Sequence, residues 1–509
     1  MNFLKEITPR EYQKNILKTC IEKNCLVVLP TGLGKTLIAL MLTIERMKSF
    51  PGQKVVFLAP TKPLAEQHLN SFKKNLGELF ADIQIFTGEI NATNRKKIWQ
   101  TADIIFSTPQ CVANDLKKNL YNLEEVCLLI EDEAHRCVKN YSYNFIAQKY
   151  KSQAKNPRIL GLTASPGNEI GKIKTICKNL AIQEVEIRTR ESPDVKEYLQ
   201  KREFEKVQID FPKEFEEMRQ VLNKLFGEYV DEIKKRGLLY APATKTNLIK
   251  LQKNLMDPKK HKELNELLGI SACAVAIKLQ HAIELLETQT LKGFNNYLKD
   301  LFEQAANKKS KGVIKLVKKT EFNFVYTKSS ELLSKKLEHP KISELISLIY
   351  KEKKQNEKFK AIVFSQFRDT AQIISETMNT IDGIKSKMFI GQAKKKGFGL
   401  SQKDQKQIII EFINGEINLL SATCIAEEGL DIPEVDAVIF YEPIPSAIRS
   451  IQRAGRTARL NKGKIIILIT KNTRDESYYY VSRAREKQMN SAIETIRQDM
   501  KNKETQKTL

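Results

Sequence analysis

The chain has 509 residues, of which 41% are hydrophobic, so it is long enough to form about three domains with apolar cores. Its 85 lysines and arginines exceed its 61 aspartates and glutamates, and the formal net charge of +24 favours a polyanionic partner, most simply nucleic acid; a generally lysine-rich proteome is the alternative explanation. No apolar run reaches the ~18–20 residues that cross a membrane, and the N-terminus lacks a signal-peptide pattern, so we expect a cytoplasmic protein that associates with the nucleoid.

Residues 1–188 alternate short apolar runs with amphipathic stretches. We expect strands at residues 25–29, 55–59, 83–86, 104–107, 126–131 and 158–162. This alternation is typical of an α/β domain whose parallel sheet is covered by helices.

Residues 189–335 differ in composition from the first part of the chain. Strand-like runs become rare, and lysine, leucine and glutamate recur at helical spacing, so we expect a helical insert domain here. From residue 336 to residue 509 the α/β pattern returns. We expect strands at residues 361–364, 418–423, 437–441 and 464–469, followed by a terminal helix.

The first motif lies between the expected strand at 25–29 and an apolar stretch that reads as the start of a helix. It consists of Pro30, Thr31, Gly32, Leu33, Gly34, Lys35 and Thr36. A glycine-rich turn in this position directs backbone N–H groups and the helix dipole at phosphate groups. We therefore expect these residues to bind a nucleotide, with Lys35 reaching the β- and γ-phosphates and the Thr36 hydroxyl holding Mg²⁺.

The second motif, Asp132-Glu133-Ala134-His135, follows the apolar strand expected at residues 126–131. Its position suits Asp132 as the carboxylate on the metal side and Glu133 as the group that orients or deprotonates the attacking water. A Gly-Lys-Thr sequence alone arises often by chance. Its pairing with this second motif predicts an enzyme that hydrolyses a nucleoside triphosphate and uses Mg²⁺.

A third motif, residues 452–459, would act from the second α/β domain. Arg456 and Arg459 are three residues apart, so they share one face of a helix and can both stabilise the transferring phosphate, with Gln452 beside them. A solvated basic helix is the alternative interpretation. Gly429 and Asp431 end a strand and loop where a carboxylate can meet the ribose.

Further candidates lie near the two nucleotide motifs. Gln13 can read the adenine edge with its amide, and Arg10 can support it. Thr163 and Ser165 end a strand that should face the second motif, and we expect them, together with His135, to couple ATP hydrolysis to nucleic-acid binding.

Several strand-to-loop turns are rich in hydroxyls and free N–H groups. Such turns suit contacts to a phosphate backbone, although each one alone is equally consistent with an ordinary turn. The residues that we expect to contact nucleic acid are Pro60, Thr61, Lys62, Thr87, Gly88, Thr108, Pro109, Ser365, Gln366 and Thr423.

Three long stretches of the second half, residues 391–405, 427–436 and 440–453, resemble the archaeal Hef family of superfamily 2 helicases of the Asp-Glu-Ala-His type, whose eukaryotic relative is the Fanconi-anaemia M translocase. The resemblance covers essentially the whole chain and implies two RecA-like domains of the P-loop NTPase class with a helical insert domain between them. It also implies an ATP-dependent DNA helicase that acts on forks and Holliday junctions in replication-fork repair and recombination, and a separate nuclease or a sliding clamp as a partner.

The chain departs from the family pattern at two places. Ala454 and Ala458 stand where the family often has Arg and Gly, and the sequence contains no Glu-Arg-Lys-x-x-x-Asp nuclease motif, so we expect the helicase portion only. Two alternatives stay open from the sequence: a duplex-RNA-dependent ATPase, and a scaffold that binds junctions and recruits a nuclease.

Two lysine clusters bear on substrate binding. One comprises Lys308, Lys309, Lys311, Lys315, Lys318 and Lys319 in the insert, and the other residues 394–396. Most lysine runs are solvated faces, but in a chain of this charge we expect contacts to phosphates.

Overall fold

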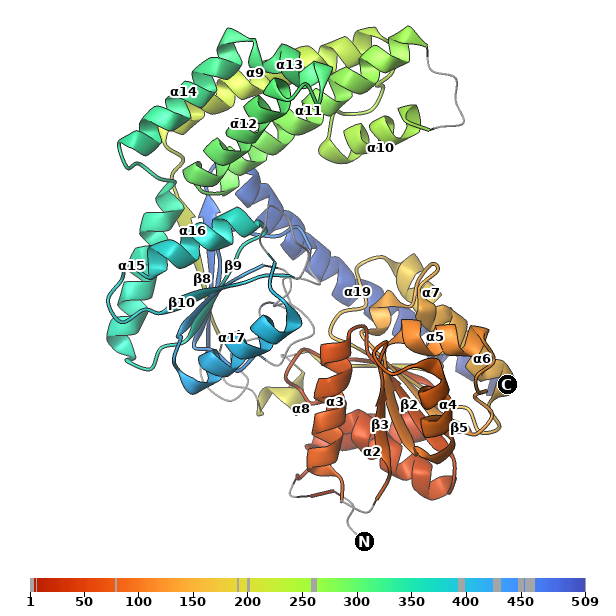
Figure 1. Cartoon of the computed structure of the whole chain (residues 1–509). Helices are drawn as coiled ribbons and strands as arrows, with labels where there is room; N and C mark the ends of the chain where they lie inside the picture. The colour runs from red at the N-terminus through yellow and green to blue at the C-terminus, as the bar shows by residue number, and fades with distance from the viewer. Residues whose placement is uncertain are drawn as a thin grey trace.

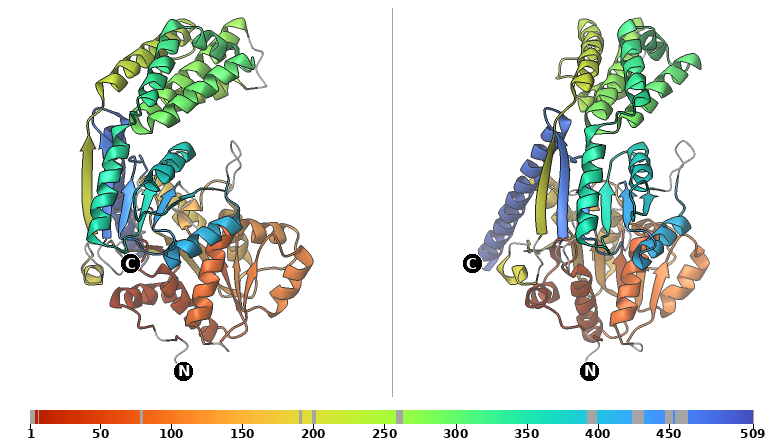
Figure 2. Two further views of the ribbon diagram at one scale, coloured as in Figure 1. Left: turned by 60° about the vertical axis from the view of Figure 1, so that its left-hand side comes forward. Right: turned by 90° about the vertical axis from the view of Figure 1, so that its left-hand side faces the viewer.

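The computed structural model describes residues 4–5, 7–77, 80–189, 192–198, 202–257, 263–391, 399–423, 432–446, 453 and 463–508. The described residues form two α/β domains and a helical domain (Figure 1). The helical domain lies beyond the second α/β domain, at the end of the molecule away from the first (Figures 1 and 2). This is the fold class that the sequence predicts.

The first domain contains a seven-stranded parallel sheet in the order β3-β4-β2-β5-β6-β1-β7. Its strands are β1 Cys25–Val28, β2 Lys54–Leu58, β3 Ile83–Phe86, β4 Ile104–Ser107, β5 Val126–Asp132, β6 Ile159–Thr163 and β7 Glu184–Ile187. Its helices are α1 Glu11–Glu22, α2 Lys35–Ser49, α3 Lys62–Asn75, α4 Ala92–Thr101, α5 Pro109–Lys117, α6 Ser142–Gln153 and α7 Ile170–Asn179, with the short helices η1 Ala134–Arg136 and α8 Pro193–Lys196. Every residue of β2 and β5 is buried, because helices cover both faces of the sheet.

The second α/β domain contains a six-stranded parallel sheet in the order β10-β11-β9-β12-β13-β8. Its strands are β8 Arg202–Ile209, β9 Ala361–Phe364, β10 Ser386–Phe389, β11 Leu419–Ala422, β12 Ala437–Phe440 and β13 Gly463–Thr470. Its helices are α15 Pro340–Gln355, α16 Arg368–Met378, α17 Gln402–Asn414 and the long α19 Arg474–Thr508.

The position of β8 differs from the expectation that residues 189–335 form the insert. β8 pairs in parallel with β13 along its whole length, so residues 202–209 belong to the second sheet. It is an edge strand in which four of the first five residues are charged, so it lacks the continuous apolar run of a central strand. The helical domain is therefore inserted after the first strand of the second α/β domain.

The helical domain consists of α9 Lys213–Lys235, α10 Lys245–Leu255, α11 Leu264–Thr288, α12 Leu291–Ala306, α13 Lys311–Val317 and α14 Thr320–Ser334. α11 is long and apolar enough to cross a membrane by length and composition, contrary to the expectation that no stretch is. Its residues Ala272, Leu279 and Leu286 are buried in the core that α9, α12, α13 and α14 complete, which explains its apolar character.

Helix α19 joins all three parts of the molecule (Figures 1 and 2). It contacts α11 of the helical domain, β13 of the second domain, and α7 and β7 of the first domain. Met489, Ala492, Ile493 and Ile496 are buried in the hydrophobic core of the first domain. The C-terminal helix thus fixes the second domain to the first.

Candidate nucleotide site and nucleic-acid interface

The motifs of the first domain meet at one edge of its sheet. β5, β6 and β1 are neighbours in the sheet, and their carboxyl ends lead to Asp132, Thr163 and the glycine-rich loop at residues 30–34. Loops at this edge of a parallel sheet form the binding crevice of open α/β folds. The structure therefore brings together the nucleotide motifs that the sequence predicts.

The glycine-rich loop depends on two glycines with left-handed backbones, Gly32 (φ 87°) and Gly34 (φ 75°). A Cβ atom on Gly34, the residue that caps α2, would lie 2.3 Å from the side-chain nitrogen of Gln13. Any larger residue here would carry both backbone strain and a clash, so the loop requires glycine.

Helix α1 supports this loop from the side. Tyr12 Oη donates a hydrogen bond to the Leu33 carbonyl oxygen at 2.8 Å, and Gln13 Nε2 donates to the same oxygen at 3.2 Å. Gln13 Oε1 accepts from the Arg10 backbone N–H at 2.9 Å. The nitrogen and the oxygen of the Gln13 amide are therefore both hydrogen-bonded to the protein beside the loop. The binding of adenine by Gln13 and Arg10 stays a prediction.

Lys35 begins α2, and its ammonium turns back into the loop. Nζ donates to the carbonyl oxygens of Leu29 at 2.8 Å and of Pro30 at 3.5 Å. These contacts hold the Lys35 ammonium against two carbonyl oxygens at the start of the glycine-rich loop. Its contact with the phosphates of a nucleotide stays a prediction.

Thr36 and Asp132, the expected metal ligands, are connected by His68 from α3. His68 Nδ1 lies 3.2 Å from Thr36 Oγ1, and His68 Nε2 lies 2.9 Å from Asp132 Oδ2. Burial alone would raise the pKa of Asp132, but His68 and Lys35 outweigh it and lower this pKa below its ordinary value. An ionised carboxylate and a hydroxyl are oxygen ligands of the kind that Mg²⁺ prefers, so these residues fit the metal.

His68 was not among the residues predicted from the sequence. It occupies an ordinary position in a helix and has no ligand spacing to any other histidine, and only the packing of α3 places it beside β5. The described residues contain no group of three or more His, Cys, Asp or Glu side chains that could hold a metal ion.

Glu133 directly follows β5 and has an unusual backbone. Its φ of 51° and ψ of 47° are left-handed, a conformation that costs free energy for residues other than glycine and is found at functional sites. Tyr143 Oη donates to the Asp132 carbonyl oxygen at 2.6 Å and fixes the preceding residue. His135 Nδ1 lies 3.2 Å from Glu133 Oε2, so the carboxylate has a defined neighbour.

The three residues expected to couple the two sites lie together. His135 Nδ1 is 3.2 Å from Thr163 Oγ1, which in turn donates to the Ser165 carbonyl oxygen at 3.0 Å. Ser165 Oγ donates to Met489 Sδ of α19 at 2.7 Å. A continuous chain of contacts therefore runs from Glu133 to the C-terminal helix; its role in coupling stays a prediction.

The residues expected to contact nucleic acid follow β2, β3 and β4 in the first domain and β9 and β11 in the second. Thr61 and Gly88 are exposed, and Lys62, Thr108 and Gln366 are half-buried. The side chains of the remaining residues are buried: Pro60, Thr87, Pro109, Ser365 and Thr423. The contacts of all these residues to nucleic acid stay predictions. Lys62 also forms an ion pair with Glu89 at 2.6 Å.

The third motif falls largely outside the described residues. Of its residues, Gln452, Arg456 and Arg459 are not among those that the structure describes. The same holds for Gly429, Asp431 and the lysines at 394–396. The roles of these residues in nucleotide and nucleic-acid binding therefore stay predictions.

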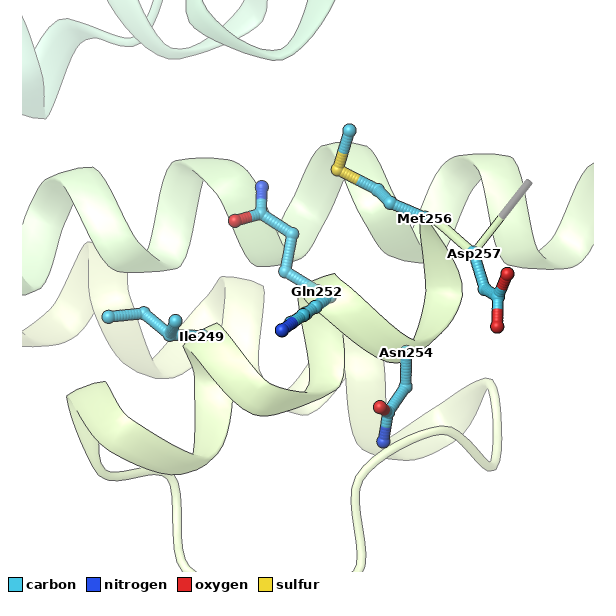
Figure 3. A pocket seen from close by; sticks show the side chains of 6 residues that line it. Ile249, Gln252, Asn254, Met256 and Asp257 are labelled. Carbon is cyan, nitrogen blue, oxygen red and sulfur yellow. The ribbon is translucent and has the colours of Figure 1, made fainter. Parts of the chain in front are cut away.

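A separate hollow lies in the helical domain, beside the end of α10. Its lining residues are Ile249, Gln252, Lys253, Asn254, Met256 and Asp257, and its volume is about 590 Å³. Gln252 and Met256 point away from Asn254 and Asp257 (Figure 3). Its side chains do not converge on a common centre, and it lies in a different domain from the nucleotide site.

Three family models match the chain. They are the res subunit of type III restriction enzymes over residues 6–168, the helicase conserved C-terminal domain over residues 340–461, and the helical bundle of an ATP-dependent RNA helicase over residues 214–332. The crystal structure of the Pyrococcus furiosus Hef helicase domain is 42% identical, with a TM-score of 0.72, and the match covers 93% of this chain and 98% of that one.

The chain belongs to the Hef family of superfamily 2 helicases. Among curated relatives of this Hef-family chain, a Methanocaldococcus jannaschii protein described as an ATP-dependent RNA helicase is 38% identical over 97% of the chain and 61% of its own length. An ATP-dependent DNA helicase of Neurospora crassa is 33% identical over 92% of the chain and 41% of its own length. The chain thus spans about half the length of these two relatives.

Proposed function

We propose that this chain is an ATP-dependent DNA helicase or translocase that acts on branched DNA, such as forks and Holliday junctions, in replication-fork repair and recombination. The observation that carries the proposal is the arrangement of the first sheet. The nucleotide motifs follow β1, β5 and β6, and the nucleic-acid loops follow the adjacent strands β2, β4 and β3. A nucleotide and a nucleic acid bound at neighbouring parts of this sheet edge would be separated by few residues, so binding of one can affect binding of the other.

Mg²⁺ would supply charge stabilisation for the triphosphate, with Thr36 and Asp132 as its protein ligands. Lys35 and the N–H groups of the loop bind the phosphates, because they place positive charge where negative charge develops. Glu133 orients or deprotonates the attacking water. Arg456 and Arg459 stabilise the transferring phosphate from the second domain, which makes hydrolysis depend on the closure of the two domains.

Closure is transmitted through the contacts that end on α19. Thr163 and Ser165 follow β6 beside the catalytic residues, and Ser165 touches Met489 of the helix that leaves the second domain. A movement of the second domain would therefore be transmitted through α19 to β6, the strand beside β5.

The helical domain is the part that we assign to branched DNA. Lys308, Lys309, Lys311, Lys315 and Lys318 are exposed, and Lys319 is half-buried and paired with Glu228. Five of the six lysines in this cluster are therefore exposed. Binding of these lysines to DNA phosphates would release counterions, so the affinity would depend strongly on salt concentration.

A duplex-RNA-dependent ATPase is the second candidate, because the helical-bundle family and the M. jannaschii relative are both described as RNA helicases. The N. crassa relative, which is described as a DNA helicase, favours DNA.

Strand separation on a fluorescently labelled DNA fork tests the proposal. We expect ATP-dependent separation or branch movement by the wild-type chain and none by Lys35→Ala, which loses the phosphate-binding charge. A matched RNA duplex in the same assay addresses the second candidate. Activity on RNA alone would reject the assignment to DNA.

A further inference from the structure

A pocket lies where the helical domain meets the second α/β domain. Its volume is about 430 Å³, toward the lower end of the range of about 300–1,000 Å³ that is typical of sites for small molecules. α11 and α12 form one side of the pocket, and the loop after β9, the start of α16 and a residue of β10 form the other. α12 and α16 are in contact at this junction (Figure 1).

Three aromatic rings line this pocket and come from both domains. The centre of the Tyr297 ring of α12 lies 4.8 Å from that of His281 of α11, and the His281 ring lies 5.5 Å from that of Phe367, which precedes α16. Tyr297 Oη donates a hydrogen bond to the Lys278 carbonyl oxygen at 3.3 Å, which fixes the position of its ring. The pocket therefore offers aromatic side chains to a flat ligand.

The two sides of the pocket are held together by Gln289, which directly follows α11 and is buried. Its Oε1 accepts a hydrogen bond from Thr370 Oγ1 of α16 at 2.8 Å and from Ser365 Oγ at 3.4 Å. Arg368 Nη2 donates to the Gly391 carbonyl oxygen, after β10, at 3.2 Å. These bonds fix the loop after β9 against the helical domain and against the neighbouring strand end, so the pocket is formed without a ligand.

The pocket lies beside the expected path of the nucleic acid. Gln366, one of the residues that we expect to contact nucleic acid, is part of its lining. Thr423, another such residue, follows β11, which pairs in parallel with β9. The Gln366 amide carries both donors and an acceptor, the groups that bind the edge of a base. A nucleic acid bound along these two loops would therefore pass next to the aromatic rings.

The charges of the lining favour a base over a phosphate. Among the described residues of the lining, Asp300 of α12 and Asp369 of α16 outnumber the single arginine, Arg368. Two carboxylates repel a phosphate group. A neutral base can instead stack on the aromatic rings and donate hydrogen bonds from an amino group to a carboxylate.

We propose that this pocket binds one unpaired base of the DNA, stacked on Phe367 and Tyr297. A paired base is stacked between its neighbours with its edge bound to its partner, so it cannot enter without being extruded. The branch point of a fork supplies an unpaired base, and a linear duplex does not. This inference rests on the proposed function, because it requires DNA that is bound along the loops of the second α/β domain.

The test uses fork DNA that carries 2-aminopurine, a fluorescent base whose emission falls when it stacks on an aromatic ring, in turn at each unpaired position next to the branch point. We expect the wild-type chain to quench the emission at one position. An abasic nucleotide at that position should lower the affinity at least about fivefold, the lower limit for the loss of one base stacked on an aromatic side chain. Equal affinity for the abasic and the complete fork at every position would overturn the proposal.

Phe367→Leu connects this effect to the pocket, because it removes the ring and keeps an apolar side chain. We expect it to abolish the quenching and to lower the affinity for the complete fork at least about fivefold, with no further loss on the abasic fork. Phe324→Leu is the matched control, since Phe324 of α14 is 44% exposed and is not part of the lining. An equal loss in both variants, or quenching that persists in Phe367→Leu, would overturn the proposal.

The comparison of the complete and the abasic fork uses the wild-type chain, so it decides the question even if Phe367→Leu does not fold. The same wild-type chain separates this inference from the proposed function. ATP hydrolysis that fork DNA stimulates, together with an affinity that does not depend on any unpaired base, would overturn the base pocket alone. A chain that neither binds fork DNA nor responds to it would reject the proposed function.

Discussion

Replacement of His68 tests how the metal ligands are held. His68→Ala removes both contacts of the ring, at 3.2 Å to Thr36 Oγ1 and at 2.9 Å to Asp132 Oδ2. A hydrogen bond to a charged group contributes about 1.5–3 kcal/mol, and removal of a group that orients a metal ligand typically lowers metal affinity about 10–100-fold. We therefore expect the Mg²⁺ concentration for half-maximal ATP hydrolysis to rise about 10–100-fold.

The assay is a Mg²⁺ titration of ATP hydrolysis at saturating ATP, together with binding of a fluorescent nucleotide in the absence of Mg²⁺. Metal-free nucleotide binding should change little, because the loop at residues 30–34 remains intact. His281→Ala in the helical domain is the control, since this histidine is half-buried and contacts Tyr297, far from the nucleotide motifs in the chain. An unchanged Mg²⁺ midpoint in His68→Ala would refute this reasoning.

Four other outcomes follow from the same account. Glu133→Gln should bind ATP and DNA but hydrolyse ATP at least about 100-fold more slowly, measured by phosphate release; near-normal turnover would contradict its role. Arg456→Ala and Arg459→Ala should each lower kcat by about 10³-fold or more with a much smaller change in nucleotide affinity, and the opposite pattern would assign them to ground-state binding. DNA affinity should fall about 10³-fold between 50 and 200 mM salt, as for about six phosphate contacts; a flat salt dependence argues against backbone contacts. Burial opposes ionisation of Glu284, but hydrogen bonds from His281 and Lys245 lower its pKa from 4.5 to about 2. The carboxylate therefore stabilises the folded protein above about pH 5, and this stabilisation disappears as the pH falls toward 2. In urea unfolding, Glu284→Gln should cost up to about 3 kcal/mol at pH 7 and much less near pH 3; a pH-independent difference would show that the carboxylate charge is not the cause.

The central strands of both sheets were predictable because burial on both faces makes them continuous apolar runs. β1, β2, β5, β9, β12 and β13 all lie within two residues of the expected positions. β8 was assigned to the insert because four of its first five residues are charged and it has no continuous apolar run. β7 and β10 were missed because each has only four residues and contains charged side chains. Neither the pairing of β8 with β13 nor the return of α19 to the first domain has a local signal in the sequence.

The nucleotide site was predictable where its residues are adjacent in the sequence, as at 30–36 and 132–135. His68 and Met489 were not, because each reaches its partner only through tertiary packing. The burial of Thr87, Ser365 and Thr423 has the same cause: composition marks a hydroxyl-rich turn but not which side chain faces solvent.

The most direct test of the central claim is the rate of ATP hydrolysis by the chain with fork DNA, linear duplex DNA, single-stranded DNA and duplex RNA, measured side by side. Lys35→Ala defines the background, and replacement of the five exposed lysines between 308 and 318 by Gln shows whether the helical domain sets the preference. We predict the highest rate with fork DNA, and a selective loss of that preference in the lysine variant. Equal rates with all four nucleic acids, or the highest rate with duplex RNA, would contradict the assignment to branched DNA.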